Sequence, residues 1–285
     1  MIKVGIDLGN SKISCVVCDI KNNFKPKILS FVSLPTININ KSNFINYESI
    51  RNEIKELIDF SAKESQTEIK SINLNIPLLK SKSNYYSSVI FTKNEIINDL
   101  HIKKAINESD FFSDLIDQEI LMNYVLNYEI DDTIIFGSPI GNFAKKLKLN
   151  FYKLSVNKNL FNTYKNIFKE LNIHVEHYVP TPLSSSLAVL NKDDKDLGCI
   201  CIDLGESSTS VSIFENNKLI FCDSVSVGSK NITNDIARGI STTKESAERL
   251  KTLYGSVQSS PSDEYEIIEV PQISSEDTHF KQINR

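Results

Sequence analysis

The same short pattern occurs twice in this chain, nearly two hundred residues apart. Each copy is an apolar strand ending in Asp, a turn with Gly and small hydroxyl residues, and a returning strand: IDLGNSKISCVVCDI at 6–20 and IDLGESSTSVSIFEN at 202–216. A tight turn containing glycine lets backbone N–H groups point outward, where they can bind an anion. An Asp at a strand end suits a hydrated Mg²⁺, which binds few protein carboxylates and several waters. The pattern predicts two hairpins that bind a polyphosphate from both sides.

One Asp-x-Gly hairpin alone is an ordinary surface turn and indicates little about function. Here the hairpins follow apolar strands at residues 2–7 and 199–203, and about a domain's length separates them. Two copies of the same strand–turn–strand pattern at that spacing favour a nucleotide-binding fold over two unrelated turns. With 285 residues, the chain is long enough for two domains with their own cores.

Composition excludes several other classes of protein. Charged residues make up 24% and hydrophobic residues 40%, which is typical of a globular protein. The net charge is −4 and no basic block reaches five residues, so nothing favours nucleic acid as a partner. No apolar run approaches the roughly 18–20 residues of a membrane span. The chain enters a strand without a signal peptide, and it is expected to be cytosolic.

Apolar periodicity predicts the order strand–strand–strand–helix–strand over residues 2–76, an order that resembles the core of an actin-type domain. Residues 84–157 predict an insertion, with a helix at 93–107 and three strands around it. The elements expected after the insertion are helices at 160–171 and 181–190, an exposed turn at 192–196, the second hairpin, a strand at 219–226, helices at 228–240 and 243–254, and a strand at 265–270. Thr181 is expected to cap its helix. The last fifteen residues predict no element.

Several stretches match one family in order along the chain. They are GIDLGNSK at 5–12, residues 119–149 with SPIG at 138–141, TPLSSSLAVL at 181–190, CIDLGESSTSVSIFEN at 201–216, VSVGSKNITNDIARGI at 225–240 and ESAERLKTLYG at 245–255. Together they resemble the bacterial cell-division protein FtsA, of the actin and DnaK ATPase superfamily. The SPIG-containing insertion resembles subdomain IC, which distinguishes FtsA from actin and DnaK.

The resemblance implies an α/β, actin-like (ribonuclease H-like) two-domain fold with the FtsA-type IC insertion and an incomplete second domain. Subdomain IA with the first phosphate hairpin would occupy residues 1–83, and the inserted subdomain IC residues 84–158. Residues 159–285 would hold the returning IA helices and part of domain II, with the second phosphate hairpin and the start of IIB.

The family's site residues carry over to matching positions in this sequence. Asp7 and Asp203 would face Mg²⁺ through its bound water. Glu248 and Lys251 would hold the ribose of ATP, and the alternative for this pair is an exposed helix ion pair worth a few tenths of a kcal/mol. The residues implied to contact the nucleotide are Gly9, Asn10, Ser11, Lys12, Gly205, Ser208, Thr209, Gly228, Ser229, Glu248 and Lys251.

The second turn departs from the family pattern D-x-G-G-G-T-T-D, because this chain has DLGESSTS. Glu206 and Ser207 replace two glycines, and a carboxylate at Glu206 is expected to repel phosphate unless Mg²⁺ or an outward rotamer intervenes. Ser210 replaces an Asp that organises metal-bound water in relatives, and Thr181 stands where DnaK has Glu. Catalytic residues are unassigned, and hydrolysis of ATP is expected to be slow at most.

The resemblance implies an ATP- and Mg²⁺-binding protein that links FtsZ filaments to the cytoplasmic face of the membrane at the division site. The implied partners are the FtsZ C-terminal peptide, further copies of the chain in actin-like filaments, and other divisome proteins through subdomain IC. Membrane contact would need a C-terminal amphipathic helix that family members carry beyond the part matched here. Their Gly-rich adenosine-binding turn also lies beyond it, so residues 1–285 are expected to bind ATP weakly or not at all.

Three alternatives remain open from the sequence. A sugar or acetate kinase of the same superfamily needs a catalytic carboxylate between its domains, and the sequence offers no clear candidate. A pilus-assembly protein of the PilM type or a DnaK-like chaperone shares the hairpins, although the SPIG-containing insertion argues against the chaperone. The last alternative is a remnant that binds no nucleotide.

Overall fold

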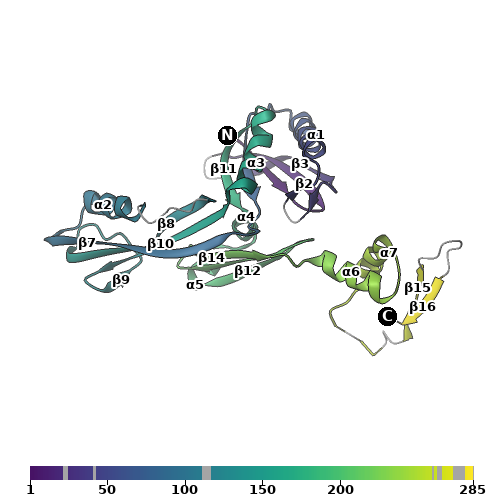
Figure 1. Cartoon of the computed structure of the whole chain (residues 1–285). Coiled ribbons are helices and arrows are strands. Elements are labelled where there is room, and N and C mark those ends of the chain that lie inside the picture. Colours follow the sequence, from purple (N-terminus) through teal and green to yellow (C-terminus); the bar gives the residue numbers. More distant parts are fainter. Residues whose placement is uncertain are drawn as a thin grey trace. The chain divides into compact units, whose positions relative to one another are not determined.

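The computed structural model describes residues 1–21, 25–40, 43–110, 117–258, 260–261, 265–271 and 280–284. Backbone contacts divide the chain into two compact units (Figure 1). The first unit comprises Met1–Asp203 with Ser210–Val225, and the second comprises Leu204–Thr209 with Ser226–Arg285. No helix among these described residues is long and apolar enough to cross a membrane.

The main sheet of the first unit has five strands in the order β11-β6-β1-β2-β3. Strand β1 pairs antiparallel with β2 and parallel with β6, which in turn pairs parallel with β11. A short ribbon of β4 and β5 follows β3. The strand bounds are β1 Ile2–Leu8, β2 Lys12–Asp19, β3 Lys27–Pro35, β4 Ile39–Asn40, β5 Asn43–Phe44, β6 Ser71–Ile76 and β11 His174–Pro180.

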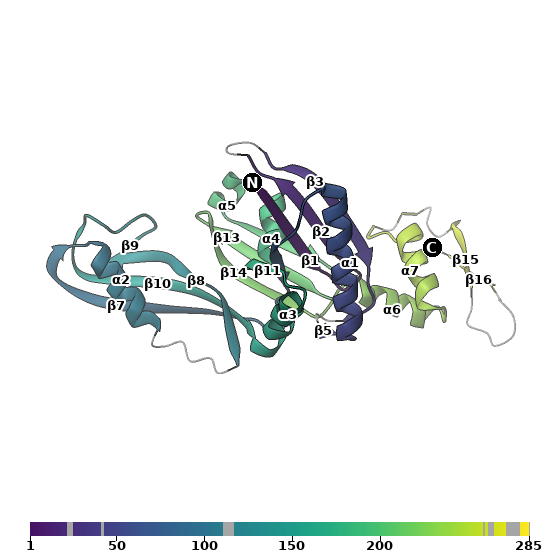
Figure 2. The same ribbon diagram turned by 90° about the horizontal axis from the view of Figure 1, so that it is seen from above.

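Helix α1 (Tyr47–Ser65) packs against β2 and β3 (Figure 2). Its buried side chains include Ile50, Ile54 and Leu57, as the helical spacing predicts. They belong to one core cluster with the inner residues of β1 and β6. Helix α3 (Lys158–Glu170) adds Phe161, Tyr164, Ile167 and Phe168 to the same cluster.

The inserted segment forms a second sheet, in the order β7-β10-β8-β9, with a core of its own. Its strands are β7 Lys82–Ile96, β8 Gln118–Ile130, β9 Thr133–Ile135 and β10 Phe143–Asn157, and α2 Asp99–Asp110 packs against β7 and β10. The helix expected at 93–107 therefore starts too early. Glu95 and Ile96 pair with β10, so strand pairing overrides the helical pattern of residues 93–96.

A third sheet, with the order β12-β13-β14, carries the second hairpin. Its strands are β12 Cys199–Leu204, β13 Thr209–Glu215 and β14 Lys218–Val225, and α4 Thr181–Val189 and α5 Lys192–Leu197 precede it. Two sequence predictions were wrong here. Thr181 is the first residue of α4 rather than its cap, which is Pro180. The expected turn at 192–196 is helical, because Asn191 and Asp194 form a reciprocal capping box.

The second unit holds the helices α6 (Ser229–Gly239) and α7 (Lys244–Tyr254), which pack together. Thr243 caps α7 by accepting a hydrogen bond from the Ser246 N–H. Strand β15 (Ile267–Pro271) pairs antiparallel with β16 (Phe280–Asn284), so the expectation of no element in the last fifteen residues was wrong. The strand β16 is defined by its pairing with β15, which the local pattern of residues 280–284 does not reveal.

Candidate functional site

The first hairpin places Asp7 near the end of β1, where the residue is half-buried. The Asn75 amide, on β6, donates a hydrogen bond of 3.2 Å to Asp7 Oδ1. Burial raises the pKa of Asp7 above its ordinary value; Asn75 and Lys12 counteract the rise, and the charge of Asp203 adds to it. Asp7 and Asp203 are thus close enough for their charges to interact.

The two turns share one local conformation. A Cβ on Gly9 would lie 2.8 Å from the Lys12 carbonyl oxygen, and a Cβ on Gly205 would lie 2.8 Å from the Ser208 carbonyl oxygen. Real side chains do not tolerate that approach to backbone, so both turns need glycine for the same steric reason. The repeated pattern in the sequence is therefore a repeated structure.

Asp203 has a partner that sequence reasoning missed. Ser185 Oγ, on α4, donates a hydrogen bond of 2.7 Å to Asp203 Oδ2. Sequence reasoning likewise missed Asn75 as the hydrogen-bond partner of Asp7. Each strand-end Asp is therefore oriented by one polar side chain from a separate element. The only signals in the sequence are the serine run at 184–186 and the Asn at a half-buried strand position.

The N-terminus of α6 packs on the second turn. The Ser229 N–H donates to the Gly205 carbonyl at 3.0 Å, and the Lys230 N–H donates to the Glu206 carbonyl at 2.9 Å. A Cβ on Gly228 would collide with both of these carbonyl oxygens. Gly228 is thus the residue that lets α6 approach the turn.

The negative charge of Glu206 is partly neutralised by a nearby lysine. Lys230 Nζ lies 3.5 Å from Glu206 Oε1, while Glu206 Oε2 is buried without a hydrogen-bond partner. The neighbouring Ser207 is 5% exposed and its hydroxyl oxygen also lacks a partner. Thr209 Oγ1 donates to the Val227 carbonyl at 2.7 Å, which fixes the end of the turn. The ion pair offsets part of the charge that was expected to repel phosphate.

Glu248 and Lys251 come together with Thr233 of α6. Lys251 Nζ lies 2.7 Å from Glu248 Oε2 and 2.9 Å from Thr233 Oγ1, and Thr233 itself is buried. The hydrogen bonds from Lys251 and Thr233 lower the pKa of Glu248. The helix ion pair is present, and the ribose contact stays a prediction.

The remaining residues that were predicted to contact the nucleotide lie in or beside the two turns. Asn10 and Ser11 occupy the first turn and Lys12 begins β2, where its charge reaches Asp7. The Ser11 carbonyl accepts a hydrogen bond from the Thr36 N–H at 3.0 Å, which ties the first turn to the end of β3. In the second turn, the Ser208 carbonyl accepts from the Gly205 N–H at 2.9 Å.

A Mg²⁺ ion fits the chemistry of this region better than a transition metal does. Within the described residues, no group of three or more His, Cys, Asp or Glu side chains is arranged to hold a metal. Asp7 and Asp203 offer hard oxygen donors with mutually repelling charge, which a cation would relieve. Mg²⁺ binds through one or two carboxylates together with waters and substrate phosphates.

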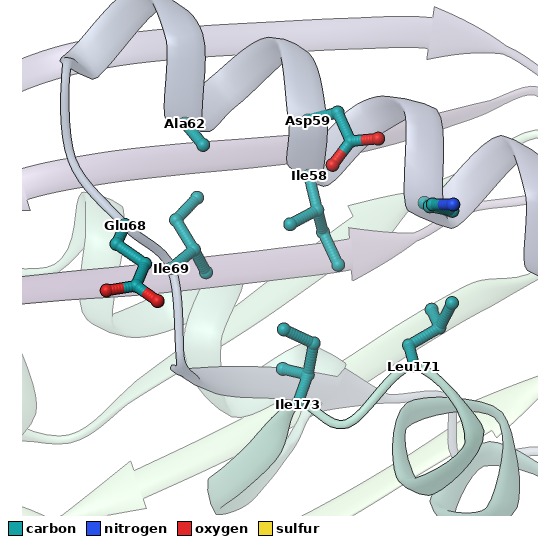
Figure 3. Close-up of a pocket in the computed structure, with 8 residues that line it drawn as sticks. Ile58, Asp59, Ala62, Glu68, Ile69, Leu171 and Ile173 are labelled. Atoms are coloured by element: carbon teal, nitrogen blue, oxygen red, sulfur yellow. The ribbon is translucent and has the colours of Figure 1, made fainter.

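A separate cavity of 240 Å³ lies between α1 and the turn from α3 to β11 (Figure 3). Apolar side chains of Ile58, Ile69, Leu171 and Ile173 line it, with Asp59 and Glu68 among its charged residues. None of the predicted nucleotide or metal residues takes part in this cavity. It is therefore not the predicted site.

Comparison with solved structures identifies the class of fold. The chain matches a chain of the PilM–PilN type IV pilus biogenesis complex with a TM-score of 0.62 at 17% identity, over 89% of this chain and 70% of that one. It matches MreB5 of Spiroplasma citri bound to ADP with a TM-score of 0.54 at 12% identity, over 99% and 71%. The protein has the actin-like ATPase fold, as predicted.

Comparison with protein families then shows which proteins of this fold the chain is similar to. The model of the family "Cell division protein FtsA" matches residues 200–284. FtsA of Rhizobium meliloti (strain 1021) is 26% identical over 282 residues, which cover 95% of this chain and 64% of that protein. FtsA of Neisseria meningitidis serogroup B (strain MC58) is 23% identical over 94% of this chain and 65% of that protein. The predicted resemblance to FtsA is confirmed, and the chain spans about 64% of the length of the Rhizobium meliloti relative.

Proposed function

We propose that each hairpin binds phosphates of ATP with Mg²⁺ and that the chain is the nucleotide-binding part of an FtsA-like cell-division protein. The observation that carries the proposal is the shared conformation of the two turns, each built on a glycine that no other residue can replace without a clash. The match to FtsA relatives over 95% of the chain supports it. MreB5 of the same fold has been solved bound to ADP and to AMPPNP.

The residues have distinct proposed roles. Asp7 and Asp203 hold the waters of Mg²⁺, which neutralises phosphate charge when bound. The backbone N–H groups of the first turn bind phosphate oxygens beside Gly9, and Lys12 adds a point charge. Gly205, Ser208 and Thr209 do the same in the second turn, with Gly228 and Ser229 supporting it. Glu248 and Lys251 hold the ribose.

In the cell, we propose the role of FtsA-type proteins, on the cytoplasmic side of the membrane at the division site. The partners would be the FtsZ C-terminal peptide, further copies of the chain, and divisome proteins that bind the sheet of β7–β10. Nucleotide would act as a conformational and polymerisation switch, with slow hydrolysis. A pilus-assembly role of the PilM type is the second candidate, because the PilM–PilN match has a TM-score of 0.62.

Magnesium-dependent binding of inorganic triphosphate to the 285-residue chain tests the phosphate sites without requiring an adenosine pocket. We expect Mg²⁺ and triphosphate together to raise the melting temperature, and the double variant D7N/D203N to lose that shift. The control is D59N, on α1 far along the chain from both turns. Equal shifts in the wild-type chain and the double variant would contradict the proposal.

The cellular role needs a different measurement. We expect the chain to bind an FtsZ C-terminal peptide more tightly than a scrambled peptide of the same composition. Binding to a PilN peptide in place of the FtsZ peptide would favour the pilus-assembly candidate instead. Fluorescence anisotropy with both labelled peptides separates the two.

A further inference from the structure

The cavity beside α1 lies just beyond the point where α3 ends. Glu170, the last residue of α3, accepts a hydrogen bond of 3.1 Å from the Tyr47 hydroxyl and lies 3.4 Å from Arg51 in an ion pair. Both partners belong to the first half of α1. The chain then enters β11 at His174, and the cavity lies against the later turns of α1 (Figure 3).

The lining of this cavity comes from one face of α1 and from two segments that lead into parallel strands. Ile58 and Ala62 are one helical turn apart, while Ile69 and Ile173 lie just before β6 and β11. Ile58 and Ile69 are each 7% exposed, and Leu171 and Ile173 are half-buried. Figure 3 shows the isoleucines and Leu171 converging on the same space. The cavity therefore has a buried apolar floor and walls that reach solvent.

The volume of the cavity limits what it can bind. At 240 Å³ it is smaller than the roughly 300–1,000 Å³ of pockets that bind drug-sized ligands. One large apolar side chain, such as phenylalanine or leucine, suits this space better than a nucleotide does. A bulky side chain buried in a desolvated pocket is a common anchor of protein interfaces.

The charged residues around the cavity give it an excess of negative charge. Asp59 is exposed and has no hydrogen bond or ion pair among the residues that the structure describes. Lys55 precedes Asp59 by one helical turn, an order that favours an ion pair less than the reverse order does. Glu68 pairs with Lys70 at 2.8 Å, but the two side chains are 75% and 76% exposed, so this pair is weak. Both carboxylates are thus accessible to a further cation.

We infer that this cavity, here termed the α1 notch, docks a partner peptide in which one bulky apolar side chain stands next to a lysine or arginine. The apolar side chain is buried between Ile58, Ile69 and Ile173, and Asp59 and Glu68 bind the neighbouring cation. A basic peptide is favoured over an acidic one because two carboxylates and a single lysine line the notch.

The α1 notch and the first phosphate turn lie at opposite ends of β6. Ile69 precedes the first residue of β6, whereas Asn75, near the end of β6, donates its hydrogen bond to Asp7. A peptide in the notch therefore leaves the first turn open. The inference does not rest on the proposed binding of nucleotide.

Methyl NMR of the 285-residue chain, labelled at the δ1-methyl groups of isoleucine, reports directly on the notch. The probes are the peptides GSRFRSG and GSRLRSG. The control peptides are GSRARSG, which lacks the apolar anchor, and GSEFESG, which reverses the charge. We expect the two probes to shift the methyl signals of Ile58, Ile69 and Ile173 in a saturable manner, and the control peptides to leave these signals unchanged.

Two exposed acids on α1 provide a matched pair of variants. D59K should weaken binding of GSRFRSG about threefold or more, because it replaces attraction of the peptide by repulsion. E56K makes the same change of charge outside the notch and should bind as the wild-type chain does. A62F should abolish the methyl shifts, because the larger side chain fills the notch. Thermal melting checks that each variant folds.

The inference is overturned if neither probe shifts the three methyl signals, or if GSEFESG binds as tightly as GSRFRSG. It is also overturned if D59K and E56K lose binding equally. A chain that is a dimer without peptide and that A62F converts to a monomer would show that a second copy fills the notch instead. The melting shift with Mg²⁺ and triphosphate is measured separately, so the phosphate sites and the notch can fail independently.

Discussion

The first and second hairpins have the same turn conformation but opposite surroundings. In the first, Ile6 is 2% exposed within a core that α1 completes; in the second, its counterpart Ile202 is 62% exposed. The turn conformation follows from glycine and a few neighbours, which are present in both copies. Burial follows from helices and strands elsewhere in the chain. Local sequence therefore determines the shape of each turn, and segments elsewhere in the chain determine whether the strand before it is buried.

The largest expected effect is a difference in stability between a charged substitution on β1 and the matching substitution on β12. I6K should unfold the first unit, costing about 4 kcal/mol or more, because an unpaired charge would enter a closed apolar core. I202K in the chain alone should change the free energy of unfolding by less than about 0.5 kcal/mol, because the position is exposed. Urea denaturation followed by circular dichroism measures both. Similar losses in the two variants would mean that the exposed face of β12 is covered in solution.

Substitution of either turn glycine by alanine should lower the free energy of unfolding by a similar amount. G9A and G205A each place a Cβ 2.8 Å from a backbone carbonyl oxygen, so each should cost about 1–3 kcal/mol. G239A is the control, because no atom lies within 4 Å of a Cβ there. Thermal and urea unfolding give the three values. A cost at only one turn would show that the two conformations are not equivalent.

Much of this architecture could be predicted because it is local. Both hairpins follow from Asp-Leu-Gly after apolar strands, and α7 follows from its cap Thr243 and its final Gly255. Contacts between distant segments were not predictable. The bond from Asn75 to Asp7 joins residues 68 positions apart. Strand β16 lies close to β15 in the sequence, but it is recognisable only once that pairing is known. Strand pairing likewise moved the start of α2 to Asp99.

The missed partners of the two Asp residues offer the next prediction. S185A removes the hydrogen bond to Asp203, and N75A removes the one to Asp7. If both orient a carboxylate toward Mg²⁺, each should weaken Mg²⁺–triphosphate binding several-fold while leaving the melting temperature without ligand nearly unchanged. S184A is the control, since the Ser184 hydroxyl donates to the Thr181 carbonyl of its own helix turn rather than to Asp203. Isothermal calorimetry over a Mg²⁺ series measures the effect, and equal affinities for S184A and S185A would contradict the orienting role.

The second turn carries a negatively charged side chain, Glu206, at a position where the first turn has the neutral Asn10. E206Q removes a negative charge beside the phosphate turn and ends the ion pair with Lys230. We expect triphosphate affinity to rise about two- to threefold, because repulsion between partly exposed charges is modest. The control D193N alters an exposed acid on α5. The gain should shrink at high salt, and a gain that ignores ionic strength would indicate a structural effect instead.

The smallest effect concerns the ion pair between Glu248 and Lys251. Because the pKa of Glu248 is lowered in the folded state, the pair stabilises the second unit above the unfolded pKa of about 4.5. That contribution is lost as the pH falls through the lower folded value. It should amount to a few tenths of a kcal/mol, since the Glu248 side chain is 54% exposed. E248Q should therefore flatten the stability profile as the pH falls below about 4.5, whereas E245Q, in the first turn of the same helix, should follow the wild-type profile. Urea unfolding at half-unit pH steps resolves the difference, and identical profiles for E248Q and E245Q would show that the pair contributes nothing to folding.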